Sequence, residues 1–308
     1  MSPEARTYLR EALSFMEQSS LRREQIDWPA LRSTAFKQAG AAQTAAETYR
    51  AIAGAVGALG DGHSWFRSPE ETDEDLGASV SQFHGLKGRR LLGGMGYISL
   101  PGVLGDDETL AAYVEQGQAS VTAADGGRAC GWIVDLRRNS GGNMWPMLTV
   151  VASILGDGPV GAYVRNDGTK IAWTIKDRAP RLDGQKFPWE PLSPVARKNP
   201  AVAVLTSRQT ASSGEAIRLA FRGRPSTRSF GQPTFGVPTN IAIQRLSDGA
   251  TIGVTDAQGA DRTGRTYDGP VTPDEAVPDQ RQGFGTKTDQ AVNAATAWLA
   301  DQPCCDGT

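Results

Sequence analysis

The sequence predicts an α/β fold in which helices pack on a largely parallel sheet, with a small domain of three helices in front of it. Two patterns lead to this prediction. From Gly94 onward, short apolar runs typical of strands alternate with segments of helical periodicity, whereas the periodicity at the N-terminus is helical. A chain of 308 residues is long for one domain. We therefore expect a helical bundle over residues 1–62 and the α/β core over residues 63–308.

Start and stop signals define the three N-terminal helices. Ser2-Pro3-Glu4 provides a serine cap, a proline in the first turn and an acidic residue. Asp27-Trp28-Pro29 opens the second helix. The third helix has Ile52 and Val56 on one face and ends at Gly60, a normal position for glycine after a helix.

In the core, strands and helices are expected to alternate. The run Trp132–Leu136 is apolar enough for a strand that is covered on both faces. The other expected strands are Met95–Leu100, Ala201–Leu205, Ser229–Gly231, Ile241–Arg245 and Thr251–Thr255, with hairpins at 79–92 and Gly161–Ile175. The expected helices are Asp106–Ala123, Met147–Leu155, 213–222 and Ala291–Leu299.

Composition excludes several classes of function. The formal net charge is −2, so no basic surface indicates nucleic acid. No apolar run approaches the roughly 18 residues that a membrane span requires. The N-terminus carries no secretory signal pattern, which favours the cytoplasm unless a signal has been removed, in which case the protein is secreted or periplasmic. Composition leaves open whether the chain forms a homo-oligomer.

The three cysteines do not indicate a redox or metal site. Cys130 precedes an apolar strand and is expected to be a small core residue. Cys304 and Cys305 are adjacent and lack metal-ligand spacing with any other cysteine or histidine. We therefore expect no metal, no cofactor and no cysteine chemistry.

One junction between a strand and a helix is a candidate site for a nucleophile. The apolar run Ala201–Leu205 is followed by a polar stretch and then by Ser212 and Ser213 at the start of the helix. A serine at this junction lies where backbone N–H groups are still unpaired and can face a developing oxyanion. The alternative is structural, because either serine could cap the helix with Glu215 completing a capping box.

A loop histidine is the candidate general base. The chain has two histidines, His63 and His84. His63 lies in a glycine-flanked loop after a helix, where a ring can be presented to a cleft. The alternative is an exposed loop residue without a catalytic role. His84 falls in the expected hairpin 79–92, and we interpret it as structural.

A glycine pair follows the strand that ends at Leu136. Gly141 and Gly142 allow the main chain to approach a ligand closely and to turn its amides toward it. Neither GxGxxG nor GxxxxGK followed by Ser or Thr is present, so phosphate binding is not indicated. The alternative is a tight turn that needs glycine.

Five motifs in order resemble a known family. These are LGDGHS after the N-terminal helices, then DLRRNSGG, TASSGE, GQPTFG and VTPDE. Together they resemble the tail-specific (C-terminal processing) protease and tricorn-core group of serine peptidases, and LGDGHS resembles its tricorn-like and retinoid-binding-protein-like branch. The resemblance runs over nearly the whole chain and implies a crotonase-like α/β core behind a small helical domain.

The resemblance implies roles for individual residues. Ser212 matches the family's nucleophile, and Gly141 or Gly142 with the N–H of Ser213 would form the oxyanion hole. The tail-specific branch has a lysine after TFG, where this chain has Val237. A Ser-Lys pair therefore lacks its base.

His63 matches the histidine of the tricorn-like branch, so the resemblance implies that it is the base. Asp268 lies close to the position of that branch's acidic residue, one residue from the usual spacing, and Asp61 is the reserve for this role. Three residues, Asn143, Gln232 and Thr234, are expected to contact the substrate.

The implied function is a serine peptidase that cleaves peptide bonds through an acyl-enzyme. Only about thirty residues separate His63 from Met95, too few for the peptide-docking PDZ module of many relatives. Two alternatives remain: an esterase or amidase with the same triad, and a non-catalytic ligand-binding protein of the same fold.

Overall fold

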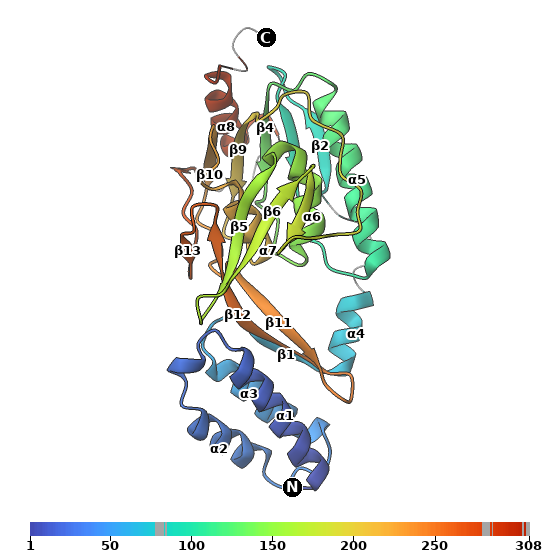
Figure 1. The fold of residues 1–308 in the computed structure, drawn as a ribbon, viewed down its shortest axis with the longest axis vertical. Helices are drawn as coiled ribbons and strands as arrows, with labels where there is room; N and C mark the ends of the chain where they lie inside the picture. The colour runs from blue at the N-terminus through green and yellow to red at the C-terminus, as the bar shows by residue number, and fades with distance from the viewer. Residues whose placement is uncertain (78–82, 84, 279–283, 285, 304, 306–308) are drawn as a thin grey trace. The chain divides into compact units, whose positions relative to one another are not determined.

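The computed structural model describes the whole chain except residues 78–82, 84, 279–283, 285, 304 and 306–308 (Figure 1). The chain forms two compact units. Unit 1 comprises Met1–Ala78, Arg165–Thr169 and Thr239–Gln258, and unit 2 comprises Ser79–Val164, Lys170–Pro238 and Gly259–Thr308. The expected domain boundary at residue 62 does not coincide with the limits of unit 1, because later segments of the chain return to the N-terminal helices.

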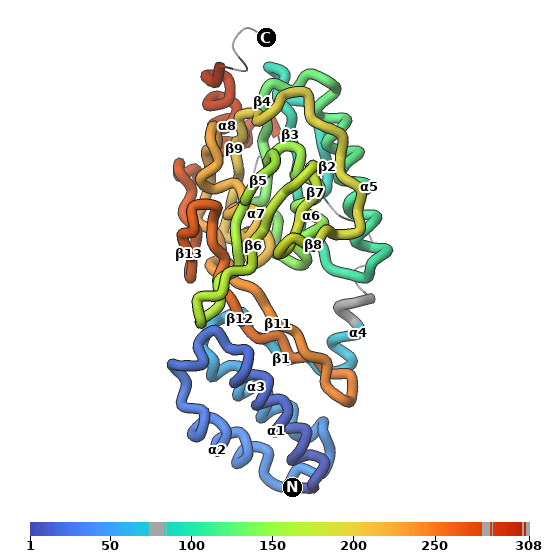
Figure 2. Tube along the Cα trace, in the orientation of Figure 1, coloured from blue at the N-terminus to red at the C-terminus, as the bar shows by residue number. Residues whose placement is uncertain are grey.

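Unit 1 begins with the three helices that the sequence predicts, drawn in blue in Figure 2. The helices are α1 (Pro3–Ser19), α2 (Trp28–Ala39) and α3 (Tyr49–Ala58), with short 3-10 turns η1 (Arg23–Gln25) and η2 (Ala46–Thr48) between them. The Ser2 hydroxyl accepts the N–H of Ala5 at 3.1 Å, and Asp27 Oδ1 accepts that of Ala30 at 3.0 Å. Both helix starts are therefore capped as expected.

An antiparallel sheet packs on these helices. The part of β12 (Thr251–Asp261) that belongs to unit 1 pairs with β1 (Trp65–Arg67) and with β11 (Thr239–Arg245). Ile252 and Val254 of β12 are fully buried in the same apolar cluster as Leu13 and Met16 of α1. The pairing explains why residues 239–258 belong to unit 1. A further helix, α4 (Pro69–Gly77), follows β1.

Unit 2 is built on the largely parallel sheet that the sequence predicts. The strands are β2 (Lys87–Arg90), β3 (Gly96–Ser99), β4 (Gly131–Asp135), β9 (Ala201–Thr206), β10 (Thr227–Gly231) and β14 (Glu275–Ala276), in the order β14-β10-β9-β4-β3-β2. All neighbours pair in parallel except β2 and β3. Every residue of β4 and β9 is buried, as expected for strands covered on both faces. His84 and part of the expected hairpin 79–92 lie outside the described residues.

Helices cover the sheet of unit 2 on both faces (Figure 1). They are α5 (Asp107–Asp125), α6 (Met144–Leu155), α7 (Ser213–Phe221) and α8 (Gln290–Ala300). On one face, α8 packs against Ile133, Ala203 and Leu205. The alternate residues Val202 and Val204 point to the other face, because side chains alternate along a strand, and α7 contacts that strand.

Unit 2 also contains antiparallel strands that the sequence reveals only in part. The expected hairpin is present as β5 (Gly158–Arg165) and β6 (Lys170–Lys176). It continues through β7 (Ala179–Leu182) and β8 (Gln185–Lys186), and β13 (Thr266–Tyr267) pairs with the end of β12. These short strands carry no clear alternation of apolar and polar residues, so period alone does not identify them.

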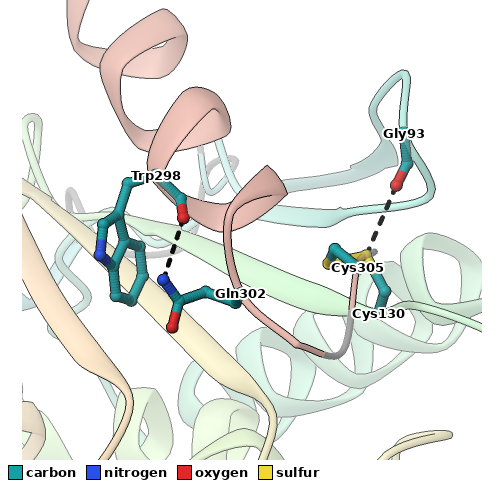
Figure 3. Close-up of a disulfide and its surroundings, with 5 residues drawn as sticks. All are labelled: Gly93, Cys130, Trp298, Gln302 and Cys305. Atoms are coloured by element: carbon teal, nitrogen blue, oxygen red, sulfur yellow. Dashed lines mark hydrogen bonds between the residues drawn. A yellow bond between two sulfur atoms is a disulfide. The ribbon is translucent and has the colours of Figure 1, made fainter. Parts of the chain in front are cut away.

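A disulfide joins the start of β4 to the C-terminal tail (Figure 3). Cys130 is buried, as expected, but the expectation of no cysteine chemistry is wrong because its sulfur is bonded to Cys305, 175 residues further along the chain. The amide of Gln302 donates to the carbonyl oxygen of Trp298 at 3.1 Å in the turn after α8 (Figure 3). The pairing depends on where this turn returns to the sheet, which no local sequence pattern encodes.

Candidate active site

Ser212 lies at the turn between β9 and α7, in a backbone conformation that is unusual for serine. Its φ is +50° and its ψ −118°. A residue other than glycine in this region costs of order 1–3 kcal/mol and persists only where its surroundings enforce it. Thr210 Oγ1 donates to the carbonyl oxygen of Leu136 at 2.8 Å, and the N–H of Ala211 donates to the carbonyl oxygen of Asn139 at 2.9 Å. The serine turn is thus tied to the loop that follows β4.

Glu215 holds the serine turn to the loop after β10. Its side chain is fully buried. Oε2 accepts the N–H groups of Ser212 at 2.9 Å and Val237 at 2.8 Å, while Oε1 accepts the N–H of Gly236 at 2.9 Å and the hydroxyl of Thr234 at 2.5 Å. Burial raises the pKa of this carboxyl, against the four hydrogen bonds, which lower it. Glu215 therefore has the capping role expected of it and in addition fixes the TFG segment.

One residue of the glycine pair, Gly141, lies directly against Ser212. A Cβ added to Gly141 would stand 2.8 Å from Ser212 Cβ and 3.3 Å from Ser212 Oγ. A Cβ on Gly142 would stand 2.0 Å from the carbonyl oxygen of Val103. Both glycines also have positive φ, +112° and +108°. Close approach and conformation both require glycine here, and the structure brings together two of the predicted segments, 141–142 and 212.

The N–H groups around Ser212 differ in how they are used. That of Gly141 donates to Asn139 Oδ1 at 3.0 Å. The N–H groups of Gly142 and Ser213 have no hydrogen-bond acceptor among the described residues. The Ser213 hydroxyl donates to the carbonyl oxygen of Gly142 at 2.5 Å. This bond ties the start of α7 to the glycine pair and leaves two N–H donors available beside the serine.

A buried ionic network supports the base of this loop. Arg137 donates to both carboxylate oxygens of Asp135 and to both of Asp289, at 2.7–3.0 Å. The Tyr97 hydroxyl donates to Asp135 Oδ2 at 2.7 Å. Burial alone would lower the pKa of Arg137, but the hydrogen bonds and charges of the two aspartates raise it. Arg137 is therefore held as a cation in the interior, a feature that sequence reasoning missed because Asp289 is 152 residues away.

His63 lies in unit 1 and is held by a hydroxyl group. Its Nδ1 lies 2.7 Å from Thr239 Oγ1 at the start of β11. Asp61 Oδ1 accepts the N–H groups of His63 at 2.9 Å and Ser64 at 2.7 Å, and Oδ2 accepts the Ser64 hydroxyl at 2.6 Å. Burial lowers the pKa of the His63 ring, and the charge of Asp61 partly opposes this. The ring is therefore biased toward the neutral form that a general base needs.

The two candidates for the acidic residue of a triad have different surroundings. Asp268 is exposed and has no hydrogen bond or ion pair among the described residues. The carboxylate of Asp61 caps its own loop through backbone N–H groups rather than through the imidazole of His63. Sequence reasoning did not identify Thr239, whose hydroxyl contacts the ring and which lies 176 residues from His63.

The three residues expected to contact substrate use their side chains in the protein itself. Asn143 Oδ1 accepts the N–H of Trp145 at 3.0 Å and so caps α6. Gln232 donates to the carbonyl of Val277 at 2.6 Å. Thr234 is buried and bonded to Glu215. Their contact with a substrate stays a prediction. No group of three or more histidine, cysteine or acidic side chains suited to a metal occurs among the described residues.

Comparison with known proteins identifies the family. Residues 94–277 match Peptidase family S41, which is more than half of the chain. The chain belongs to peptidase family S41. Membership confirms the resemblance to tail-specific and tricorn-type proteases, places the chain among peptidases, and indicates a peptide or protein as substrate.

Individual relatives extend the similarity over the whole length. The nisin-resistance protein of Lactococcus lactis subsp. lactis is 25% identical over 302 residues, covering 97% of this chain and 88% of the relative. A lipoprotein from Streptococcus agalactiae has 27% identity and a TM-score of 0.79, with 97% of each chain covered. The photosystem II D1 C-terminal processing protease shares the fold at a TM-score of 0.64 and 15% identity, with 89% of this chain and 93% of the protease covered.

Proposed function

We propose that the chain is a serine peptidase in which Ser212 attacks the peptide carbonyl and His63 is the general base. The observation that carries the proposal is the turn at Ser212. Its strained φ of +50° persists because the loops after β4 and β10 hold the turn, and Gly141 lies against its side chain. A helix cap alone does not require a strained conformation. We also propose that the core is crotonase-like.

Hydrolysis then proceeds in two steps. The Ser212 oxygen bonds to the carbonyl carbon as its proton passes to His63 Nε2, and the tetrahedral intermediate collapses when that proton is given to the leaving amine. Water, activated by the same ring, then cleaves the acyl-enzyme. The proton can reach Nε2 only if that atom is unprotonated, so Nδ1 carries the hydrogen and donates it to Thr239 Oγ1 at 2.7 Å. We therefore propose Thr239 as the group that orients the ring.

The N–H groups of Gly142 and Ser213 are the proposed oxyanion donors. They lie beside Ser212 without another acceptor among the described residues, whereas the N–H of Gly141 is bonded to Asn139. Removal of one such donor by mutation typically costs about 3–4 kcal/mol of transition-state stabilisation. Gly141 is needed instead for the close approach of the loop to Ser212 Cβ.

We propose nisin or a related peptide, encountered outside the cytoplasm, as the substrate. The nisin-resistance protein resembles this chain over 97% of its length, and its name suggests such a peptide. The similar structure of a lipoprotein points to the cell envelope. The Cys130–Cys305 disulfide supports this location, because disulfides persist in oxidising compartments and are rare in the cytosol.

Covalent labelling tests the proposal. Wild-type protein should react with a fluorophosphonate at Ser212, identified by mass spectrometry of the labelled peptide, and Ser212→Ala should abolish both labelling and peptide cleavage. The matched control is Ser213→Ala, which keeps the proposed N–H donor and should still be labelled. Labelling of Ser212→Ala at the wild-type rate, or a label found on Ser213, would refute the assignment of the nucleophile.

A further inference from the structure

A cavity lies in unit 2 at the opposite end of α7 from Ser212. Its volume is about 480 Å³. Its lining includes Arg218, in the second half of α7, and Arg222, which directly follows that helix. Arg265, Tyr267 and Asp274 also line it. A helix of nine residues is about 13 Å long. A ligand in this cavity is therefore remote from the proposed nucleophile.

Positive charge exceeds negative charge in the lining. Four arginines line the cavity, with two aspartates. Asp261 is occupied by other groups: it accepts the hydroxyls of Thr263 at 2.6 Å and Tyr267 at 2.7 Å and also receives backbone N–H groups. It makes no ion pair with an arginine of the cavity among the described residues.

The second aspartate is only a distant partner of the guanidinium groups. Asp274 Oδ2 accepts both the N–H of Ser229, at 2.9 Å, and its hydroxyl, at 2.7 Å. The nearest guanidinium atoms are Arg218 Nη2 at 3.7 Å and Arg222 Nη1 at 3.8 Å. Both separations exceed hydrogen-bond length. The carboxylate therefore leaves the N–H donors of these arginines largely uncommitted.

One of the four arginines serves as a structural reference. Arg224 uses all three guanidinium nitrogens within the protein, donating to the carbonyl oxygens of Leu155, Pro200 and Ile154 at 2.9–3.1 Å. Arg224 thus shows how an arginine in this region can use every guanidinium nitrogen in hydrogen bonds within the protein. The other three differ from it.

Arg218 is the most unusual of these three. It is 1% exposed, and its buried Nε has no hydrogen-bond partner among the described residues. Nη2 donates to the Ser229 hydroxyl at 2.6 Å. Burial lowers the pKa of Arg218 to about 10, with the charge of Asp274 opposing this. Its ion pair with Asp274 is 3.7 Å long, so a buried guanidinium of this kind gains from a closer anionic partner.

Arg222 and Arg265 reach the same cavity from its rim. The guanidinium of Arg265 lies 5.3 Å from the centre of the Tyr267 ring, and that of Arg222 lies 5.9 Å from it. Among the described residues, the side chain of Arg265 makes no hydrogen bond. That of Arg222 makes one, to the carbonyl of Thr272 at 3.5 Å, besides its 3.8 Å ion pair with Asp274. Two planar donor groups thus lie near one aromatic ring and line the same cavity as Arg218.

We propose that this cavity is a binding site for an oxyanion, a carboxylate or phosphate group on a small ligand, held by Arg218, Arg222 and Arg265. Guanidinium groups present paired N–H donors that match the oxygens of such groups. The cavity falls within the size range of small-molecule sites. The proposal does not depend on the peptidase assignment, because none of these residues belongs to the proposed catalytic machinery.

Calorimetry on the full chain tests the site, with inorganic phosphate and succinate as probes in separate titrations at constant ionic strength set with chloride. We expect saturable binding of at least one probe with a Kd of about 1 mM or tighter. Which probe binds distinguishes a phosphate ligand from a carboxylate ligand. The double variant R222Q/R265Q should weaken that binding at least about tenfold, because it removes both rim guanidinium groups.

The matched control is R228Q. Arg228 lies in the same unit and pairs with Glu275 at 3.3 Å on the surface, outside the cavity lining. Its loss should leave the Kd unchanged. Failure of both probes to bind the wild type would overturn the proposal, as would equal binding by the wild type and the double variant. A conservative R218K variant tests the buried position, and unchanged affinity there would remove Arg218 from the site.

Discussion

The turn that carries Ser212 and the loop that carries His63 are held in different ways. Ser212 is held in a strained conformation by Gly141, which lies against its side chain, and by the buried carboxylate of Glu215, which has four donors. The His63 loop is fixed mainly by Asp61, two residues before it, and its ring has one hydroxyl partner. Several long-range contacts thus determine the position of the serine segment, whereas the described residues show one such contact to the imidazole ring.

The difference matters for the proposed mechanism, because the two segments have different tasks in it. Oxyanion donors are effective when they are already in place and need no reorganisation during the reaction. A general base must change its protonation state and exchange protons with two groups in turn. The serine segment, which is held by several hydrogen bonds, suits stabilisation of the oxyanion. The His63 ring, for which the described residues show one neutral partner, suits proton transfer. Mutations at each segment should therefore differ in their effects on stability and on rate.

Replacement of the proposed base should have the largest effect. His63→Ala removes the proton acceptor and should lower kcat/KM by about 10²–10⁴-fold, the usual contribution of general acid–base catalysis. The melting temperature should change little, because the loop is held by Asp61 through the backbone. Steady-state kinetics on a cleaved peptide and a thermal melt measure the two effects. Wild-type turnover by His63→Ala would remove this histidine from the mechanism.

Disruption of the serine segment should affect stability and rate together. Glu215→Gln replaces one oxygen, which accepts two hydrogen bonds, with a nitrogen that accepts none. Each buried donor left without a partner costs about 1–3 kcal/mol. We expect a lower free energy of unfolding and at least about tenfold slower cleavage, since each 1.36 kcal/mol in the barrier corresponds to tenfold in rate.

The control for this variant is Glu275→Gln. Glu275 pairs with Arg228 at the surface, where such pairs contribute about 0–1 kcal/mol, so denaturant unfolding should barely change. If Glu215→Gln were as stable and as active as Glu275→Gln, the buried carboxylate would not be what holds the turn.

Local signals in the sequence predicted much of the fold and the two segments that meet at Ser212. The caps at Ser2 and Asp27, the apolar strand Ala201–Leu205 and the glycine pair each depend on neighbouring residues, and the structure has them as expected. A strand-to-helix turn and a glycine loop can be recognised without knowing the tertiary structure.

What the sequence did not reveal depends on contacts between distant segments. Thr239 lies 176 residues from His63, Asp289 lies 152 residues from Arg137, and the disulfide spans 175 residues. Periodicity and capping carry no information about such pairs, because they arise only from the path of the folded chain. For the partner of the His63 ring, motif spacing suggested Asp268 and not Thr239. A catalytic role of Asp268 stays a prediction.

The group that orients the imidazole should give a smaller effect. Thr239→Val keeps the shape of the side chain and removes the hydroxyl at Nδ1. Loss of one hydrogen bond of about 0.5–1.5 kcal/mol should lower kcat about 2–10-fold, with little change in KM. Thr239→Ser should restore the rate, because it restores the hydroxyl. Asp268→Asn is the comparison. If it slowed the enzyme more than Thr239→Val did, the carboxylate rather than the hydroxyl would be the partner of the ring.

The smallest effect is a displacement of the pH profile. Burial lowers the pKa of His63, and the charge of Asp61 raises it in part. A base with a lowered pKa stays neutral, and active, to a more acidic pH than an ordinary histidine, whose pKa is about 6.5. The acidic limb of kcat/KM should therefore lie below that value, since this parameter reports the free enzyme.

Asp61→Asn tests whether the charge of Asp61 contributes to the pKa of His63. The variant retains an oxygen that can accept the N–H groups of His63 and Ser64 but lacks the negative charge that favours the protonated ring. The acidic limb should therefore move to still lower pH, and activity near neutrality should be nearly unchanged. A limb that moved toward higher pH would mean that Asp61 acts on the position of the ring rather than on its charge. The loop of His63 would then depend on its neighbours as strongly as the turn of Ser212 does.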